Sequence, residues 1–317
     1  MYKKVIGMSA LAPRMNRKEV TKRTMPSSQS KAAQSSLTEG PIAKTLFVFS
    51  LPILLGNVLQ TLNGSINSIW VGKLLGETAL AATANANLIM FFLISAIFGI
   101  SMAAVILIGQ NLGAKRVSEA KKVVGTSTVF FVLLSIITGA IGVLFSPLIL
   151  DLLNTPADAK AMAVSYTRII FAGVPFMFGF NLIMAVLRGS GDAKTPFYFL
   201  LLSAVIDVGL NPLLIQGYGP FPQMGIAGSA TATLIAQSIS LVLLVAYLYA
   251  KRYFLRLTRD DLHLLRMDWQ IIKVLIQKGL PMGLNMVVVS LSNLLLIHLV
   301  NAYGSEATAA FGIANQI

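Results

Sequence analysis

The residue best placed to do chemistry is Asp207, which lies in the middle of the apolar run FLLLSAVIDVGLNPLLI. A carboxylate within a bilayer is costly unless it is hydrated or paired, and such residues commonly mark ion or proton pathways. Burial favours the neutral form of a carboxyl group, which would suit a carrier that exchanges protons or cations. The alternative interpretation is a hydrogen-bonded carboxyl group with only a structural role.

Two residues that follow Asp207 could share its task. Asn211 comes four residues later and therefore lies on the same face of a helix. Pro212 comes next, and because proline has no N–H it leaves a carbonyl of the preceding turn free to act as a ligand. The pattern favours a site that couples to a proton or a cation at Asp207 and Asn211.

A second group of polar side chains follows the apolar segment 43–71. Its amides and hydroxyls are Asn57, Gln60, Thr61, Asn63, Ser65, Asn67 and Ser68. Most of these fall on two neighbouring stripes of one helix. Other apolar segments add amides at Asn85, Asn87, Asn181 and Gln237. The stripes indicate a hydrated central cavity, although for any single residue hydrogen bonding between packed helices is the alternative. The predicted lining of a substrate cavity is Asn57, Gln60, Asn63, Asn85 and Asn181.

Long apolar helices must hold these polar residues, because 56% of the chain is hydrophobic and only 12% is charged. A soluble domain would carry about a quarter charged residues. The apolar runs are continuous rather than alternating, which favours membrane-spanning helices over a barrel. The expected spans are 43–71, 80–112, 123–150, 161–187, 196–215, 226–249 and 269–302, with an eighth beginning at 307.

The inventory of reactive side chains is poor for an enzyme. The chain has no cysteine and two histidines, which excludes a disulfide framework, a thiolate nucleophile and a thiol-based zinc site. It also lacks the glycine-rich lysine motif of ATP-driven pumps. We therefore expect no catalytic residue, no metal site and no cofactor, with H⁺ or Na⁺ as the coupling ion.

The net charge of +13 could suggest nucleic acid, but its distribution argues against that partner. Much of the charge lies in residues 1–40, a polar tail without an apolar run that is predicted to be disordered. The loops after the second, fourth and sixth spans are basic, whereas the loops between them are not. Because basic loops stay on the cytoplasmic side, this alternation predicts a cytoplasmic N-terminus.

The first span recurs late in the chain, since KTLFVFSLP at 44–52 is echoed by KVLIQKGLP at 273–281. Six spans separate the copies, so both enter the membrane in the same orientation, as in transporters built from parallel repeats. The sequence thus looks like a duplicated protein that lacks most of its second copy. The expected units are a tail at 1–40, a six-helix lobe at 41–254, a cytoplasmic linker at 255–268 and a partial second lobe at 269–317.

Several segments together resemble the multidrug and toxic compound extrusion (MATE) transporters. They are Leu51-Pro52, NSIWVGK at 67–73, GQNLGAK at 109–115, LRGSGDAKTP at 187–196, DVGLNP at 207–212 and GIAGSA at 225–230. The resemblance implies an all-α polytopic membrane protein with two six-helix lobes around a central cleft. It implies a monomer in the bacterial inner membrane, and export of cationic or amphipathic compounds in exchange for H⁺ or Na⁺.

The resemblance also implies that Asp207, Asn211 and Asn67 are neighbours in a cation site of the first lobe. Many bacterial members carry Asp where this chain has Asn67, and they often show Asn before Asp where this chain has Asp207 before Asn211. A site with one carboxylate fewer favours H⁺ over Na⁺.

The prediction is therefore secondary active multidrug efflux by alternating access. The first rival is a flippase for lipid-linked precursors of the same superfamily, which would need cationic residues in its cavity, whereas the middle of these spans holds no Lys or Arg. The second rival is a shortened chain without transport activity. A membrane-embedded enzyme would need a partner for Asp207, and the sequence offers no acid or histidine near it.

Overall fold

The structure is a computed structural model that describes residues 41–152 and 157–301. The predicted basic tail and the start of the eighth span lie outside these residues. The described elements are α3 (Ile42–Leu75), α4 (Glu77–Gly113), α5 (Val117–Leu152), α6 (Ala157–Gly189), α7 (Lys194–Gln216), α8 (Ile226–Ala250), the short 3₁₀ helix η1 (Arg259–Leu264) and α9 (Trp269–Asn301).

Seven of these helices are long and apolar enough to cross a membrane, which confirms the expected all-α, multi-pass fold. Each begins and ends within a few residues of its predicted span. The largest difference is at α5, which starts at Val117 rather than at 123. Its first turns carry Glu119, Lys121 and Lys122, so hydropathy alone misses them. An acid such as Glu119 in the first turn interacts favourably with the helix dipole.

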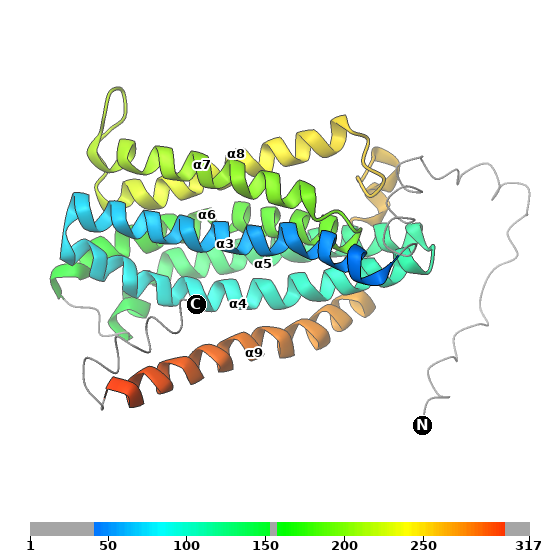
Figure 1. Ribbon diagram of the computed structural model, residues 1–317, viewed down its shortest axis with the longest axis horizontal. Helices are drawn as coiled ribbons and strands as arrows, with labels where there is room; N and C mark the ends of the chain where they lie inside the picture. The colour runs from blue at the N-terminus through cyan, green and yellow to red at the C-terminus, as the bar shows by residue number, and fades with distance from the viewer. Residues whose placement is uncertain (1–40, 153–156, 302–317) are drawn as a thin grey trace, which may run out of the picture.

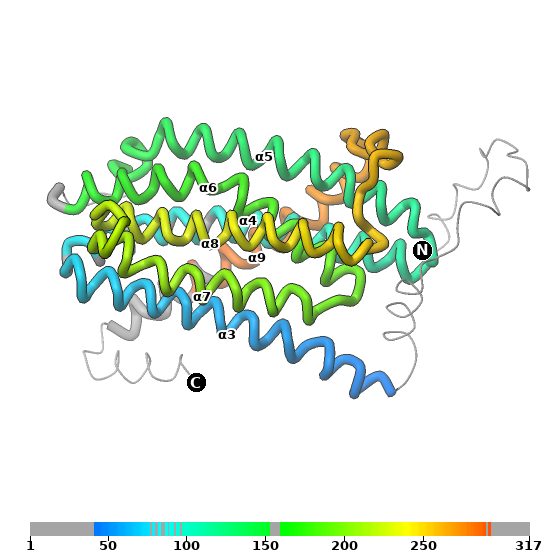
Figure 2. Tube along the Cα trace, turned by 90° about the horizontal axis from the view of Figure 1, so that it is seen from above, coloured from blue at the N-terminus to red at the C-terminus, as the bar shows by residue number. Residues whose placement is uncertain are grey.

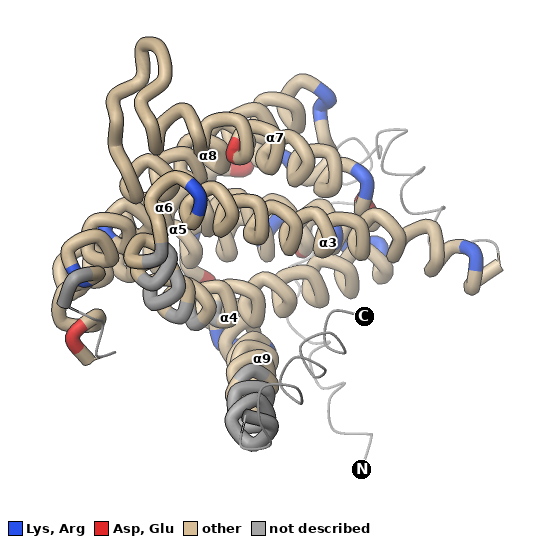
Figure 3. The backbone as a smooth tube through the Cα atoms, turned by 60° about the vertical axis from the view of Figure 1, so that its left-hand side comes forward, with Lys and Arg blue, Asp and Glu red and all other residues tan. Residues whose placement is uncertain are grey.

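Helices α3 to α8 run lengthwise beside one another with α6 at their centre (Figure 1, Figure 2). α6 packs on α4, α5 and α8, and α7 packs on both α3 and α8. The start of α3, the end of α8 and η1 lie at one end of the bundle (Figure 1). Most charged positions lie near the ends of helices (Figure 3), as the cost of burying charge in lipid requires.

Glycines allow α5 to lie close against the central helix. A Cβ atom on Gly142 would lie only 1.9 Å from the ring of Phe171, and one on Gly139 would lie 2.9 Å from the Phe171 carbonyl oxygen. Beyond this contact, the buried rings of Phe131 and Phe178 meet edge to face at 6.1 Å. Such offset aromatic pairs add to the stabilisation from apolar burial, so α5 and α6 form the firmest part of the core.

Helix α9 stands apart from the other helices and packs mainly on α4 (Figure 1, Figure 3). The two backbones meet at glycines, because a Cβ atom on Gly99 would lie 2.2 Å from the Gly279 carbonyl oxygen and 2.7 Å from the Gly283 nitrogen. Small residues spaced four apart permit this close approach of membrane helices. Ala103 and Leu275 are fully buried beside the crossing.

The predicted linker is docked on α5 rather than free. Lys121 Nζ pairs with Asp261 Oδ2 at 2.7 Å, and Lys122 Nζ pairs with Asp268 Oδ2 at 2.7 Å. Thr258 and Asp261 form a reciprocal cap at the start of η1. A Cβ atom on Gly125 would lie 2.4 Å from the Leu264 carbonyl oxygen. Ion pairs, a capped helix and backbone contact therefore fix this segment against α5.

We expect Asp261→Asn to loosen the linker. Burial raises the pKa of Asp261, but hydrogen bonds from Lys121 and Thr258 outweigh it, so the pKa of this carboxyl group lies below its usual value. Its stabilising contribution is therefore present above the pKa of the unfolded chain and is lost as the pH falls through the folded-state pKa. The amide weakens the hydrogen bonds that Lys121 and Thr258 donate to this carboxylate, which costs about 1 kcal/mol in the free energy that holds the linker closed, or roughly fivefold in the open population.

Limited trypsin digestion at neutral pH should report this change as faster cleavage at Arg259 and Arg266 in the variant than in the native protein. Asp260→Asn is the matched control, because Asp260 is exposed and its carboxylate makes no bond among the described residues. Equal cleavage of Asp261→Asn and the native protein would show that the ion pair and cap do not hold the linker.

Candidate functional site

A cavity of about 420 Å³ lies between α3, α4, α6, α7 and α8. Polar side chains of α3 form one wall, as the stripe of amides predicts. Of the predicted cavity residues, four line it: Asn57, Gln60, Asn63 and Asn181. Asn67 and Ser68 join them, whereas Thr61 of the predicted stripe is not among the lining residues. The side chain of Asn85 lies outside the described part of the structure, and Asn87 lines the cavity instead.

Asp207 lies on the cavity wall, only 2% exposed. Its Oδ2 atom accepts hydrogen bonds from Asn63 Nδ2 and Asn67 Nδ2, both at 2.8 Å. Its Oδ1 atom accepts from Thr233 Oγ1 at 3.0 Å and from Asn211 Nδ2 at 3.4 Å. The Asn211 amide also donates to Asn67 Oδ1 at 3.1 Å. The structure thus brings Asp207, Asn211 and Asn67 together, as both helix spacing and the resemblance predict.

Helix periodicity explains how three separate helices supply these groups. Asn63 and Asn67 are four residues apart on α3, and Asp207 and Asn211 are four apart on α7, so each pair lies on one face. α3 and α7 pack against each other, which sets the two faces opposite. Thr233 comes from α8, which packs on the other side of α7. We name these five residues the Asp207 cluster.

The Asp207 cluster has more acceptors than donors. Asn63 Oδ1 and Asn211 Oδ1 are buried and find no hydrogen-bond partner among the described residues. Asp207 has no Lys, Arg or His within 4.0 Å in that same part of the chain. A buried acceptor without a donor is costly, so a proton or a small monovalent cation would relieve it. The described residues offer no group of three His, Cys, Asp or Glu side chains for a metal ion.

Sequence reasoning missed Thr233, although a signal for it exists. Ser229, Thr233 and Gln237 recur at four-residue intervals in an apolar helix and all line the cavity. A stripe of this kind marks a polar face as clearly as the amides of α3 do. Of these three residues the sequence singles out only Gln237, because a Ser or Thr hydroxyl group often donates to a carbonyl of its own helix and then needs no other partner.

Thr233→Val should destabilise the folded protein by about 1.5–3 kcal/mol, the range for a hydrogen bond to a charged group. The effect should appear as a lower unfolding temperature. Thr231→Val is the control on the same helix, because Thr231 Oγ1 donates only to the Ala227 carbonyl, at 2.7 Å. Equal losses in the two variants would contradict a charged acceptor at Asp207.

One cation also reaches this cavity. Arg188, expected in the loop after the fourth span, instead lies in the last turn of α6 and lines the cavity. Its Nε atom is buried without a hydrogen-bond partner among the described residues, and none of their acids pairs with it. The cavity wall therefore presents an unpaired guanidinium group as well as the Asp207 carboxylate.

Comparisons with known proteins agree with this architecture. The MatE family model matches residues 52–213. The chain is 39% identical over 293 residues to "Probable multidrug resistance protein YoeA" of Bacillus subtilis, covering 92% of this chain and 63% of that protein. It is 34% identical over 281 residues to "Probable multidrug resistance protein YpnP" of the same organism, covering 88% and 61%.

Solved structures share the fold. A "MOP superfamily transporter from Pyrococcus furiosus" superposes with a TM-score of 0.78 at 24% identity, covering 90% of this chain and 61% of that one. A "MATE in complex with MaD3S" gives a TM-score of 0.79 at 24% identity, covering 88% and 62%. The chain spans 63% or less of the length of these relatives. Because the family model covers half of the sequence and the fold agrees, the chain belongs to the MATE family of membrane transporters.

Proposed function

We propose that the protein acts in secondary active efflux of cationic or amphipathic compounds, with H⁺ exchanged at the Asp207 cluster. The observation that carries this proposal is a buried carboxylate with four donors from three helices and no cationic partner among the described residues. The names of the YoeA and YpnP proteins, which describe multidrug resistance, support the substrate class. Membership of a transporter family favours a carrier over an enzyme.

Protonation of Asp207 would change how α3, α7 and α8 are held together. The ionised carboxylate accepts hydrogen bonds from all three helices, and bonds to an ionised acceptor are about twice as strong as neutral ones. A proton weakens these bonds and turns one carboxyl oxygen into a donor. The unpartnered oxygens of Asn63 and Asn211 are then available as acceptors. The cluster would repack, and a shift of α3 against α7 would alternate access to the cavity.

The groups of the Asp207 cluster favour one coupling ion over the other. Na⁺ prefers several anionic or carbonyl oxygens, and here one carboxylate is surrounded by amide N–H donors that a cation would have to displace. We therefore favour H⁺. The basic loops predict a cytoplasmic N-terminus, and with that orientation protons would enter the cavity from the outer side of a bacterial inner membrane.

The test is transport of a fluorescent organic cation into inverted membrane vesicles that contain the protein. An imposed pH gradient should drive uptake and a Na⁺ gradient should not. Uptake driven by Na⁺ alone would assign the other ion, and no uptake with either gradient would contradict efflux by this chain. Binding of the dye, measured without any gradient, separates a loss of coupling from a loss of recognition.

A second candidate is export of compounds that carry a negative group. Arg188 favours it because its guanidinium group lies on the cavity wall and has no ionic partner among the described residues. A protein described as an "FAD transporter" in Shewanella oneidensis is 26% identical over 281 residues, and a flippase for lipid-linked precursors would use the same charge. Competition between FAD and the bound dye distinguishes the two candidate functions. FAD should displace the bound dye only if this second function is right, and Arg188→Gln should then remove that displacement.

A further inference from the structure

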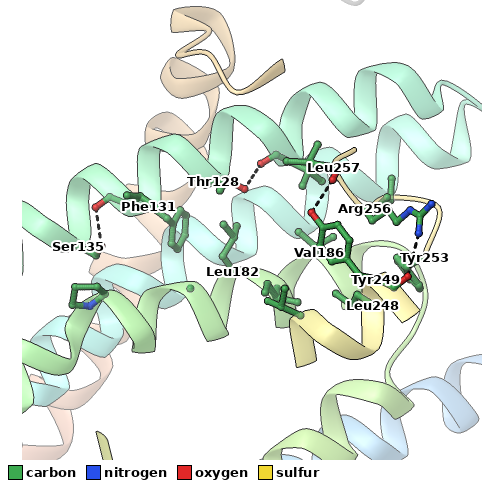
Figure 4. A pocket seen from close by; sticks show the side chains of 17 residues that line it. Thr128, Phe131, Ser135, Leu182, Val186, Leu248, Tyr249, Tyr253, Arg256 and Leu257 are labelled. Carbon is green, nitrogen blue, oxygen red and sulfur yellow. Dashed lines mark hydrogen bonds between the residues drawn. The ribbon is translucent and has the colours of Figure 1, made fainter. Parts of the chain in front are cut away.

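A second cavity, of about 230 Å³, is shown in Figure 4. The residues of α6 that line it lie on a different face from those that line the first cavity. The walls of the second cavity are α5 and α8, which both pack on α6 rather than closely on each other. This leaves a groove between two membrane-spanning helices with α6 as its floor. We name it the α5–α8 groove.

The α5–α8 groove is apolar where it lies within the spans. Phe131 and Val132 of α5 face Leu182 of α6 and Val245 of α8 across it. The hydroxyl groups along α5 are already used, since Thr128 donates to the Val124 carbonyl and Ser135 to the Val132 carbonyl, both at 2.8 Å. Val132 is 50% exposed at the rim, so the groove opens toward the surroundings of the bundle. Such a wall suits hydrocarbon and offers nothing to a polar ligand.

One end of the groove is closed by the segment that follows α8, and this end is cationic. Arg256 lies there, with its Nη1 atom donating to the Tyr249 carbonyl at 3.1 Å (Figure 4). The Tyr249 hydroxyl donates in turn to the Leu257 carbonyl at 2.7 Å. Tyr253, which lines the same end, is held by a 2.6 Å hydrogen bond between its hydroxyl and Ser190 Oγ. These hydrogen bonds hold the turn after α8 and so fix the position of the Arg256 guanidinium group.

No acid among the described residues forms an ion pair with the arginines at this end. Asp261 pairs with Lys121, and Asp268 pairs with Lys122. These two acids of the linker therefore form ion pairs with lysines of α5. Among the described residues neither Arg252 nor Arg256 has an ionic partner. A guanidinium group keeps several donors in a fork that matches phosphate. An apolar groove with a guanidinium group at one end has the charge distribution of a binding site for an anionic lipid.

We propose that the α5–α8 groove binds an anionic phospholipid, with one acyl chain lying between α5 and α8 and the phosphate against Arg256. Arg252 and Lys251, both exposed at the end of α8, add to the attraction for a lipid of net negative charge. A zwitterionic lipid offers the same acyl chain and phosphate but brings its own cation to this basic surface. The groove shares no lining residue with the cavity that holds the Asp207 cluster.

The test uses the purified protein with phosphatidylglycerol and phosphatidylcholine of identical acyl chains, and native mass spectrometry to count retained lipid. The native protein should retain phosphatidylglycerol about tenfold more strongly, as expected for a charge-assisted contact. Arg256→Gln should remove most of this preference. Arg259→Gln is the matched control, because it removes the same charge from the same segment at an exposed position that does not line the groove.

A second variant tests the groove itself. Thr128→Phe fills the groove and breaks only a bond within α5, so retention of both lipids should fall about equally. An Arg256→Gln protein that still prefers phosphatidylglycerol would overturn the headgroup site. Undiminished retention by Thr128→Phe would overturn the acyl-chain site. Arg256 is half-buried in the turn after α8 and lies outside the buried clusters of the helices, so the Arg256→Gln variant keeps the proposal testable even where Thr128→Phe fails to fold.

Discussion

Asp207→Asn is expected to reduce proton-driven transport to the background rate of vesicles without the protein. The substituted amide keeps the size of the carboxyl group but has no site that gains and loses a proton. Whichever way the amide turns, its Nδ2 group replaces one of the two carboxylate oxygens that accept hydrogen bonds. Dye binding without a gradient should persist, because the other polar groups of the cavity wall are unchanged.

Transport of the fluorescent cation under an imposed pH gradient is the primary measurement. Infrared difference spectroscopy should also show a carboxylic-acid band that grows on acidification and is missing in Asp207→Asn. Asp151→Asn is the matched control, since Asp151 is exposed, lies at the end of α5 and pairs only with Lys160. Transport at the native rate by Asp207→Asn would remove Asp207 from the coupling mechanism.

Gly99→Leu is expected to separate α9 from α4. A side chain at position 99 would overlap the backbone of Gly279 and Gly283, and backbone cannot move aside as a flexible side chain can. Overpacking of this kind costs about 3 kcal/mol at the upper end of measured values, and α9 has little other contact with the six-helix bundle. The expected outcome is a folded bundle from which α9 has detached.

The chain has no cysteine, so an introduced pair reports this contact without interference. Ala103→Cys with Leu275→Cys places two thiols in the buried cluster beside the crossing, and bridging by a short crosslinker should be efficient. Gly99→Leu should abolish it. Gly209→Leu is the control, because no atom lies within 4 Å of a Cβ atom at that exposed glycine in α7. Efficient bridging in the Gly99→Leu background would show that the helices tolerate a side chain at the crossing.

Hydropathy and spacing were sufficient to predict the helices and much of the Asp207 cluster. Each span is a continuous apolar run, so its position follows from composition alone. Asn63 with Asn67, and Asp207 with Asn211, share helix faces because four residues make about one turn. Resemblance then predicted that these two faces meet, and the contact between α3 and α7 confirms it. Whether the cluster couples to an ion stays a prediction.

Contacts between helices could not be predicted in the same way, because no local pattern fixes how two helices are aligned. Thr233 enters the Asp207 cluster only because α8 lies at the correct height beside α7. Arg188 joins the cavity because α6 continues two residues beyond its predicted span. The linker was predicted as a cytoplasmic connection, and its docking on α5 depends on the pairing of Lys121 with Asp261. Each case depends on tertiary geometry that a single sequence does not encode locally.

The position of α6 has a consequence for regulation. One of its faces carries Asn181 into the polar cavity, and the next residue, Leu182, lines the α5–α8 groove. A single helix about 10 Å across therefore forms the partition between the solutes in the cavity and the lipids outside. An occupant that displaced α6 on one side would therefore also move a wall of the cavity on the other side. The composition of the membrane would in this way act as an effector of transport, with no ligand entering the cavity.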